Sequence, residues 1–207
     1  MLVEGDPTQD VAATLNIQRI VKNGYVLERD PIPIPAGTGL STPLLGDFEA
    51  GLFAAEPFEW SGTADSMAGG NSEATLARTA DTKTENSTHA LRIDASVKPG
   101  FPFPWAGASV ALSQSSATTA VDVSSYKSLS FAIKGTPGTY RVMAFSSGAA
   151  GIPPTQNIEV NEDWQTLVVR LAEFDGLQAE QLVGFSFVAG PSFGDASFYL
   201  DNVRLLN

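Results

Sequence analysis

The sequence predicts an all-β protein, an antiparallel β-sandwich or jelly roll with a short β-hairpin in front of it. Apolar and polar residues alternate in many short runs, which is the period of a strand with one buried face. Glycine, proline and serine separate these runs, and few windows have the period of a helix. Many short strands between turn signals are typical of sandwiches and jelly rolls.

The N-terminal hairpin is predicted from Asn23-Gly24, which lies between two apolar-rich runs at residues 18–22 and 25–29. Both residues tolerate the positive φ of a type I′ turn, which is the favoured two-residue hairpin connection. We therefore expect two short antiparallel strands here.

The alternation of the later strands is clearest in residues 91–97, where every second side chain is apolar. The same period recurs with Val110 and Leu112, with Leu129, Phe131 and Ile133, with Leu167, Val169 and Leu171, and with Val183, Phe185 and Phe187. Residues 198–205 also predict a strand. Residues 140–145 are apolar on both faces, which predicts a central strand covered on both sides or a strand that lines a groove.

A segment rich in proline and glycine divides the chain into two parts. Residues 31–43 contain Pro31, Pro33, Pro35 and Pro43, and repeated X-Pro steps favour an extended linker. The part before it, residues 1–30, is too short to bury a core of its own. The part after it, residues 44–207, has the punctuation of one β-domain.

Composition excludes several classes of partner. The formal net charge is −11 with only 12 basic residues, which are scattered, so neither nucleic acid nor an anionic membrane is an expected partner. The chain has no cysteine, which rules out disulfides and zinc–thiolate sites and leaves the compartment undetermined. No apolar run reaches the length of a membrane span, and the first residues lack the features of a signal peptide.

No catalytic residue is predicted for this chain. His89 is the only histidine and lies in a predicted surface loop, and no Gly-x-Ser-x-Gly elbow occurs. The acid pairs Glu159 with Glu162 and Glu173 with Asp175 fall at predicted strand ends. A solvated rim therefore explains them better than the paired carboxylates of a glycosidase.

The first part of the chain carries one family resemblance. Its residues are Leu2-Val3-Glu4-Gly5-Asp6-Pro7, Asp10, Asn16-Ile17 and Val21-Lys22-Asn23-Gly24-Tyr25-Val26. They resemble the C-terminal end of metal-dependent amidohydrolases, where this end belongs to a small β-sandwich beside the catalytic barrel. The resemblance implies that residues 1–30 are the tail of a parent hydrolase acting on C–N bonds, and that the parent catalytic domain is a partner.

The second part carries another resemblance. Its residues are Gly46-Asp47-Phe48-Glu49, Trp60, Asp65-Ser66-Met67-Ala68-Gly69-Gly70-Asn71-Ser72, Trp105-Ala106-Gly107, Tyr126, residues 129–135, Tyr140-Arg141-Val142, Trp164-Gln165-Thr166-Leu167 and Leu200-Asp201-Asn202-Val203-Arg204-Leu205. Their order resembles the galactose-binding-like jelly rolls of the complex I intermediate-associated protein 30 family and of family 11 carbohydrate-binding modules. The assembly-factor family has glycine directly after the methionine, so residues 67–70 depart from its pattern. The resemblance implies a non-catalytic accessory domain for a carbohydrate or another polar ligand, or alternatively a protein-interaction or assembly module.

The same resemblance implies a structural calcium ion near the two ends of the domain. Ca²⁺ takes six to eight hard oxygen ligands, which two carboxylates and loop carbonyls supply. We expect Glu49 and Asp201 as ligands and Asp47 as a weaker third, with Phe48 pointing inward and its two neighbours to the opposite face. The alternative is that these are edge-strand acids in a chain with 23 of them.

Four residues are the candidates for the ligand site, because sugars stack on aromatic rings and bond to polar side chains. Trp105 follows a proline-containing loop, and Tyr140 and Arg141 lie on the strand that is apolar on both faces. Trp60 is the fourth candidate. Core packing is the alternative for Trp60 and Trp105, and it is the expectation for Trp164.

Overall fold

The computed structural model describes residues 19–22, 25–28, 38–50, 58–82, 87–113, 118–149 and 151–207. The chain divides into two compact units, Met1–Pro35 and Ala36–Asn207. In the first unit, β1 (Arg19–Lys22) and β2 (Tyr25–Glu28) form an antiparallel hairpin in which Lys22 pairs with Tyr25. This register confirms the hairpin predicted from Asn23-Gly24. The rest of residues 1–30, and residues 31–37 of the predicted linker, lie outside the described residues.

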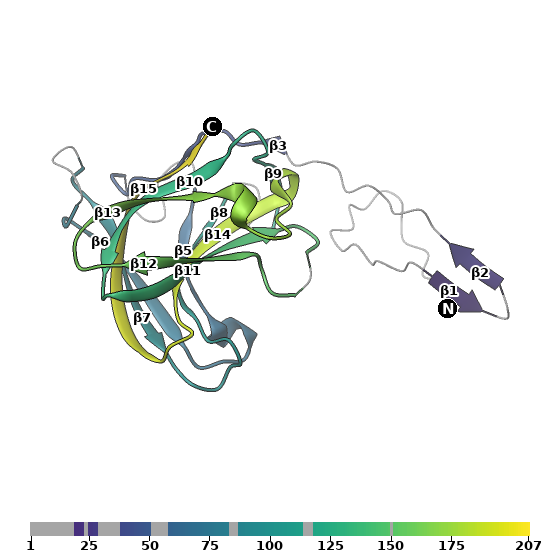
Figure 1. The fold of residues 1–207 in the computed structure, drawn as a ribbon, viewed down its shortest axis with the longest axis horizontal. Coiled ribbons are helices and arrows are strands. Elements are labelled where there is room, and N and C mark those ends of the chain that lie inside the picture. The colour runs from purple at the N-terminus through teal and green to yellow at the C-terminus, as the bar shows by residue number, and fades with distance from the viewer. Residues whose placement is uncertain are drawn as a thin grey trace. The chain divides into compact units, whose positions relative to one another are not determined.

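The second unit consists of two β-sheets that pack face to face (Figure 1). We call sheet I the strands β12 (Thr155–Val160), β11 (Gly138–Ser146), β14 (Leu182–Ala189), β8 (Ala106–Ala111) and β5 (Trp60–Ala64), with β9 (Val121–Asp122) and β3 (Thr38–Gly39) at one end. Sheet II comprises β13 (Gln165–Arg170), β10 (Ser128–Gly135), β15 (Gly194–Leu206), β7 (Ala90–Val97) and β6 (Glu73–Thr79), and β4 (Leu44–Gly46) also pairs with β15. All these pairings are antiparallel except that of β3 with β9. The unit is therefore the predicted antiparallel jelly-roll sandwich.

Aromatic side chains from both sheets fill the space between them. Phe131 of sheet II meets Phe187 of sheet I edge-on, with ring centroids 5.0 Å apart. The indole of Trp60 lies against Phe187 and, edge-on, against Phe48. Burying aromatic and aliphatic side chains between two sheets is the main stabilising contribution in such a fold.

The predicted strands agree with those observed, apart from shifts at their ends. In β7 the side chains of Leu91, Ile93, Ala95 and Val97 are buried in alternation, as predicted. Leu112 lies just past the end of β8, and Leu171 begins the short 3₁₀ helix η2 (Leu171–Glu173). Thr38–Gly39, placed in the linker by the sequence, is strand β3 because it pairs in parallel with β9.

Two further 3₁₀ helices, η1 (Asp65–Ala68) and η3 (Ala179–Gln181), complete the described elements. In the described part of the chain, no helix has the length and apolar character needed to cross a membrane.

Candidate functional site

The outer face of sheet I is recessed at its centre. Side chains that alternate with the core phenylalanines of β14 point away from the core, yet Val188 and Ser186 are only 0% and 2% exposed. Met143, which is paired with Ser186 on the neighbouring strand β11, is 6% exposed. Outward side chains lose their solvent contact when neighbouring side chains cover them or stand higher than they do. We call this buried centre of the outer face of sheet I the hollow.

Two glycines add positions without a side chain to the floor of this hollow. A Cβ atom on Gly107 of β8 would lie 2.0 Å from the carbonyl oxygen of Phe187, and one on Gly184 of β14 would lie 2.3 Å from that of Val110. Because real Cβ atoms do not approach backbone so closely, the pairing of β8 with β14 requires glycine at both positions. The hollow is thus a consequence of strand packing.

Arg141 lies at one end of this face with an incomplete set of hydrogen bonds. Its Nη2 donates to the carbonyl oxygen of Pro104 at 2.7 Å. Its Nε is buried and has no acceptor among the described residues. Burial lowers the pKa of Arg141, but a guanidinium stays charged in proteins. A buried, charged donor without an acceptor is costly, and a ligand oxygen at Nε would remove that cost.

Trp105 lies at the same end of sheet I as Arg141. It directly precedes β8, where Ala106 pairs with Ala189, while Arg141 is opposite Val188. The ring is half-buried and meets Phe101 edge-on at 5.4 Å. Two of the four candidate residues for the ligand site therefore lie at one end of one face.

The sequence reasoning missed Asp65, the buried carboxylate that holds the backbone of Trp105. Its Oδ2 accepts from the Trp105 amide at 3.2 Å, and its own amide donates to the Trp105 carbonyl at 3.0 Å. The Ser72 amide and hydroxyl also donate to it, at 2.8 Å and 2.7 Å. The sequence gives no clear signal for Asp65, because it follows the mixed strand β5 and its partners are distant in the chain.

The other two candidates for the ligand site lie in the interior. Trp60 is fully buried, and its Nε1 donates to the carbonyl oxygen of Leu45 at 2.9 Å. Tyr140 alternates with Arg141 along β11 and so points inward, where burial raises the pKa of its phenol. Its hydroxyl donates to the Thr136 carbonyl at 2.9 Å. Neither ring offers a face to a ligand at the surface.

Trp164 differs from its expected core position. It is half-buried on the outer side of sheet II, where it meets Tyr199 edge-on at 6.3 Å. Its Nε1 lies 3.4 Å from Oδ1 of the exposed Asp81. The expectation fails because Trp164 precedes β13 rather than lying within it.

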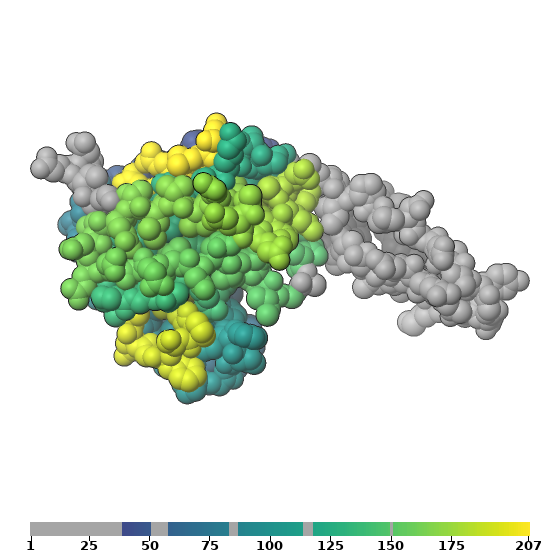
Figure 2. Space-filling view, viewed as in Figure 1, coloured from purple at the N-terminus to yellow at the C-terminus, as the bar shows by residue number. Residues whose placement is uncertain are grey.

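The loops at the Trp105 end of the sandwich carry exposed apolar side chains. Met67 of η1, Phe103 and Phe193 are 78%, 56% and 64% exposed. Their loops meet because Ala64 pairs with Ala106 and Val97 pairs with Gly194. Figure 2 shows the β14–β15 loop, in yellow, beside the teal segments that carry the other two.

Glu49 and Asp201, the predicted metal ligands, lie on either side of one hydroxyl group. The Oγ of Ser87 is 3.0 Å from Glu49 Oε1, 2.9 Å from Asp201 Oδ2 and 3.1 Å from the His89 carbonyl oxygen. A hydroxyl donates one proton, so it cannot satisfy three acceptors at once. The result is a small region rich in hard oxygen atoms, including two carboxylates, which is the chemistry that calcium selects.

Glu49 is held strongly in its ionised form. The Thr88 hydroxyl and the amides of Thr88 and His89 donate to its carboxylate, and they lower its pKa from 4.5 to about 2 against the opposing effect of desolvation. Arg78 binds the Phe48 and Glu49 carbonyl oxygens and contacts His89 Nδ1 at 2.9 Å. His89 is thus part of this cluster at the domain's end.

Asp47 does not join the two other acids. Its Oδ1 accepts from the amide of Glu49 at 3.2 Å, which closes a local turn. The expected strand alternation fails here because β4 ends at Gly46 and Phe48 has a φ of 58°. Phe48 does point inward, as predicted. Within the described ranges, no group of three or more His, Cys, Asp or Glu side chains is arranged to hold a metal ion.

The two packed sheets define the second unit as a jelly-roll β-sandwich. A family 11 carbohydrate-binding module of a cellulosomal cellulase of Clostridium thermocellum has a similar structure, with 16% identity, a TM-score of 0.60, and 82% of this chain and 96% of that chain covered. A family 11 module from Clostridium thermocellum, in complex with a β-1,3-1,4-mixed-linked tetrasaccharide, is 15% identical with a TM-score of 0.58, and the match covers 82% of this chain and 98% of that chain. A family 30 carbohydrate-binding module of a Clostridium thermocellum cellulase is 16% identical with a TM-score of 0.50, and the match covers 64% of this chain and 82% of that chain. No protein-family model and no curated protein matches the chain. At these identities the likeness establishes a shared fold.

Proposed function

We propose that the second unit is a non-catalytic carbohydrate-binding module whose ligand lies in the hollow of sheet I. The observation that carries this proposal is the buried Nε of Arg141, which has no acceptor among the described residues. The fold shared with carbohydrate-binding modules supports the class of ligand. A sugar hydroxyl is a neutral acceptor of the kind that such a donor requires.

The surroundings of Arg141 suit a sugar chain. Asn157 pairs with Arg141 in β12 and is exposed, so its amide can both donate to and accept from sugar hydroxyls. Ser109 and Ser186 share a hydrogen bond of 2.7 Å across the floor. Trp105 adds a half-buried aromatic ring at the end of the hollow. A face with these polar groups and an aromatic ring at one end would suit a sugar chain that extends along it.

The experiment is titration calorimetry with a panel of soluble oligosaccharides that includes the β-1,3-1,4-mixed-linked tetrasaccharide. Arg141→Ala should weaken binding by about tenfold or more, because a hydrogen bond from a charged donor is lost. Arg170→Ala is the matched control, since this exposed arginine lies on β13 of the other sheet. Equal affinities of the two variants would contradict the assignment of the hollow. Silence across the whole panel would contradict carbohydrate binding.

The proposal includes a structural calcium ion held by Glu49 and Asp201. The support is the excess of oxygen acceptors around the Ser87 hydroxyl, and the His89 carbonyl adds a further oxygen atom. Such an ion would neutralise two carboxylates and join β15 to the segments that precede β7. Millimolar Ca²⁺ should raise the Tm of the chelator-treated protein but not that of Glu49→Gln. An equal Tm with and without Ca²⁺ would argue against the ion.

The proposal also covers the first unit as the C-terminal tail of a metal-dependent amidohydrolase. Its support is the sequence resemblance of residues 1–30 together with the β1–β2 hairpin. The module would then position that hydrolase near a glycan. The gene sequence upstream of Met1 is the test, since a histidine-rich barrel is expected there and an unrelated sequence would contradict the parentage.

The alternative is a protein-interaction or assembly module of the complex I intermediate-associated protein 30 type. The observation in its favour is the exposure of Met67, Phe103 and Phe193 on loops at one end of the sandwich. Exposed apolar side chains that lie close together commonly mark protein contacts. The oligosaccharide panel separates the two functions, because this alternative predicts no sugar binding.

A further inference from the structure

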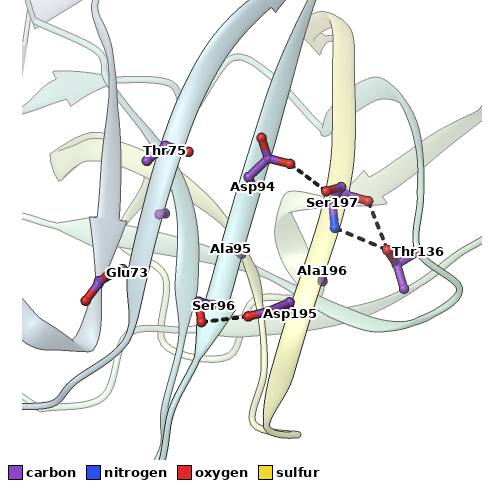
Figure 3. A pocket seen from close by; sticks show the side chains of 10 residues that line it. Glu73, Thr75, Asp94, Ala95, Ser96, Thr136, Asp195, Ala196 and Ser197 are labelled. Carbon is purple, nitrogen blue, oxygen red and sulfur yellow. Dashed lines mark hydrogen bonds between the residues drawn. The ribbon is translucent and has the colours of Figure 1, made fainter.

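The outer face of sheet II contains a separate depression with a volume of about 400 Å³ (Figure 3). This volume is within the range of roughly 300–1,000 Å³ that is typical of small-molecule sites. The depression spans the adjacent strands β6, β7 and β15. Because it belongs to the opposite sheet, it is distinct from the hollow of sheet I.

The register of the three strands explains the shape of this depression. Ala74, Ala95 and Ala196 are paired across the strands in one row. Their small side chains face the core, so only backbone is presented outward between the flanking rows. One flanking row contains Asp94 paired with Ser197, and the other contains Ser96 paired with Asp195. Two polar walls therefore stand on either side of a floor without side chains.

The walls present carboxylates whose positions are fixed. Ser197 Oγ donates to Asp94 Oδ1, and Ser96 Oγ donates to Asp195 Oδ1 at 2.7 Å, as Figure 3 shows. Arg92 also donates to Asp94 Oδ1, at 3.0 Å and 3.1 Å. In both aspartates, Oδ2 receives no hydrogen bond from a described residue. The depression thus offers two oriented acceptors and few free donors.

An aromatic wall continues from this depression along the sheet. Tyr199 lies two residues beyond Ser197 on the same face of β15, which is about 6.6 Å between Cα atoms. Trp164 packs edge-on against Tyr199. The Nζ of Lys134 lies 5.4 Å from the ring centroid of Trp164 and 5.0 Å from that of Tyr199. Both rings are half-buried, so part of each remains exposed to solvent.

We infer that this depression is a second sugar-binding site, for a neutral glycan. Carboxylate oxygens accept strong hydrogen bonds from sugar hydroxyls, which supply the donors that the walls lack. The adjacent rings provide an apolar surface for the C–H face of the next sugar along the chain. Glu73 and Asp94 form ion pairs with Lys98 and Arg92, whereas Asp195 has no ion pair with a described residue, and its charge disfavours an acidic polysaccharide. This site does not depend on binding in the hollow of sheet I.

Two sites on opposite faces have a measurable consequence. The sheets pack about 10 Å apart, so a short oligosaccharide cannot occupy both outer faces at once. The tetrasaccharide should therefore bind with a stoichiometry of two per protein. A long glucan should instead be cross-linked, since each face takes a different chain.

The experiment combines calorimetry with amide NMR, using the β-1,3-1,4-mixed-linked tetrasaccharide as the probe. In the wild type, amide shifts should change in residues 94–96 and 195–197 as well as around Arg141. Asp195→Asn should weaken the sheet II site by about tenfold and leave the shifts around Arg141 unchanged, because one charged acceptor is removed from an exposed position. Asp175→Asn is the matched control, because this exposed acid lies in the turn after η2 and lines neither site.

The outcomes separate the two proposals. Loss of one site in Asp195→Asn and of the other in Arg141→Ala supports both. If the wild type has one site, Arg141→Ala removes it, and Asp195→Asn binds like Asp175→Asn, the sheet II site alone is overturned. One site removed only by Asp195→Asn overturns the sheet I hollow alone. No shift change in any residue at millimolar probe overturns the sheet II site for neutral glycans.

Discussion

The two outer faces of the sandwich are built in opposite ways. On sheet I the outward positions include Gly107 and Gly184, where backbone of the neighbouring strand leaves no room for a Cβ atom. On sheet II long side chains meet in pairs, such as Lys134 with Asp81 at 2.6 Å and Arg92 with Asp94 at 3.0 Å. We therefore expect a larger side chain to destabilise sheet I, and the loss of one member of a charged pair to destabilise sheet II.

The largest effect is expected from Gly107→Ala in sheet I. The new methyl group would meet the Phe187 carbonyl oxygen at 2.0 Å, so β8 and β14 must separate. We expect a loss of about 3 kcal/mol or more in the free energy of unfolding, measured by urea denaturation. Gly39→Ala is the control, since nothing lies within 4 Å of its new methyl group. Equal urea midpoints for Gly107→Ala and Gly39→Ala would contradict the expected sensitivity of sheet I to added side-chain volume.

A smaller effect is expected from Lys134→Met in sheet II. Methionine keeps the apolar stem but removes the charge above Trp164 and Tyr199 and the ion pair with Asp81. The lysine side chain is only 18% exposed, so we expect a loss of about 1 kcal/mol.

Lys98→Met is the control for this prediction, because its ion pair with Glu73 is exposed on both sides. Such pairs contribute about 0–1 kcal/mol. If Lys98→Met is destabilised as much as Lys134→Met, the contacts of Lys134 with the two aromatic rings contribute nothing to stability beyond its ion pair.

The smallest effect is expected from acid titration of Glu49, at the end of sheet II. Its pKa is lowered to about 2, first by the Thr88 hydroxyl, so its contribution to stability is present above pH 4.5 and is lost as the pH falls towards 2. Solvent screens this contribution because the side chain is 35% exposed. In chelator-treated protein, Glu49→Gln should show a flatter decline of Tm over this range than the wild type. Parallel declines would exclude Glu49 as the source.

The strands were predictable from the sequence because their alternation is a local property. In β7 each apolar residue faces the core, and the hairpin at Asn23-Gly24 follows from turn chemistry alone. The environment of each tryptophan was not predictable in this way. Trp60 is buried because Phe48 and Phe187 meet it from distant segments of the chain, and Trp164 is half-buried because it lies outside its strand.

The candidate site shows the same division. Arg141 became a candidate because it lies on a strand with two apolar faces. Its hydrogen bond to Pro104, which comes from a distant part of the chain, and the missing acceptor of its Nε have no signal in the sequence. Glu49 and Asp201 were identified as a pair through family resemblance. The hydroxyl of Ser87 between them had no signal of its own, because it enters from the segment before β7.

The position of β15 has a consequence for the synthesis of the protein. It is the last strand of sheet II in the chain and the one that joins β10, β7 and β4. The chain emerges from the ribosome from the N-terminal side, so the β6–β7 pair and the β10–β13 pair cannot be joined until β15 has emerged. Their open edges are then exposed to other nascent chains. The nascent module should therefore be a chaperone client until β15 inserts between them.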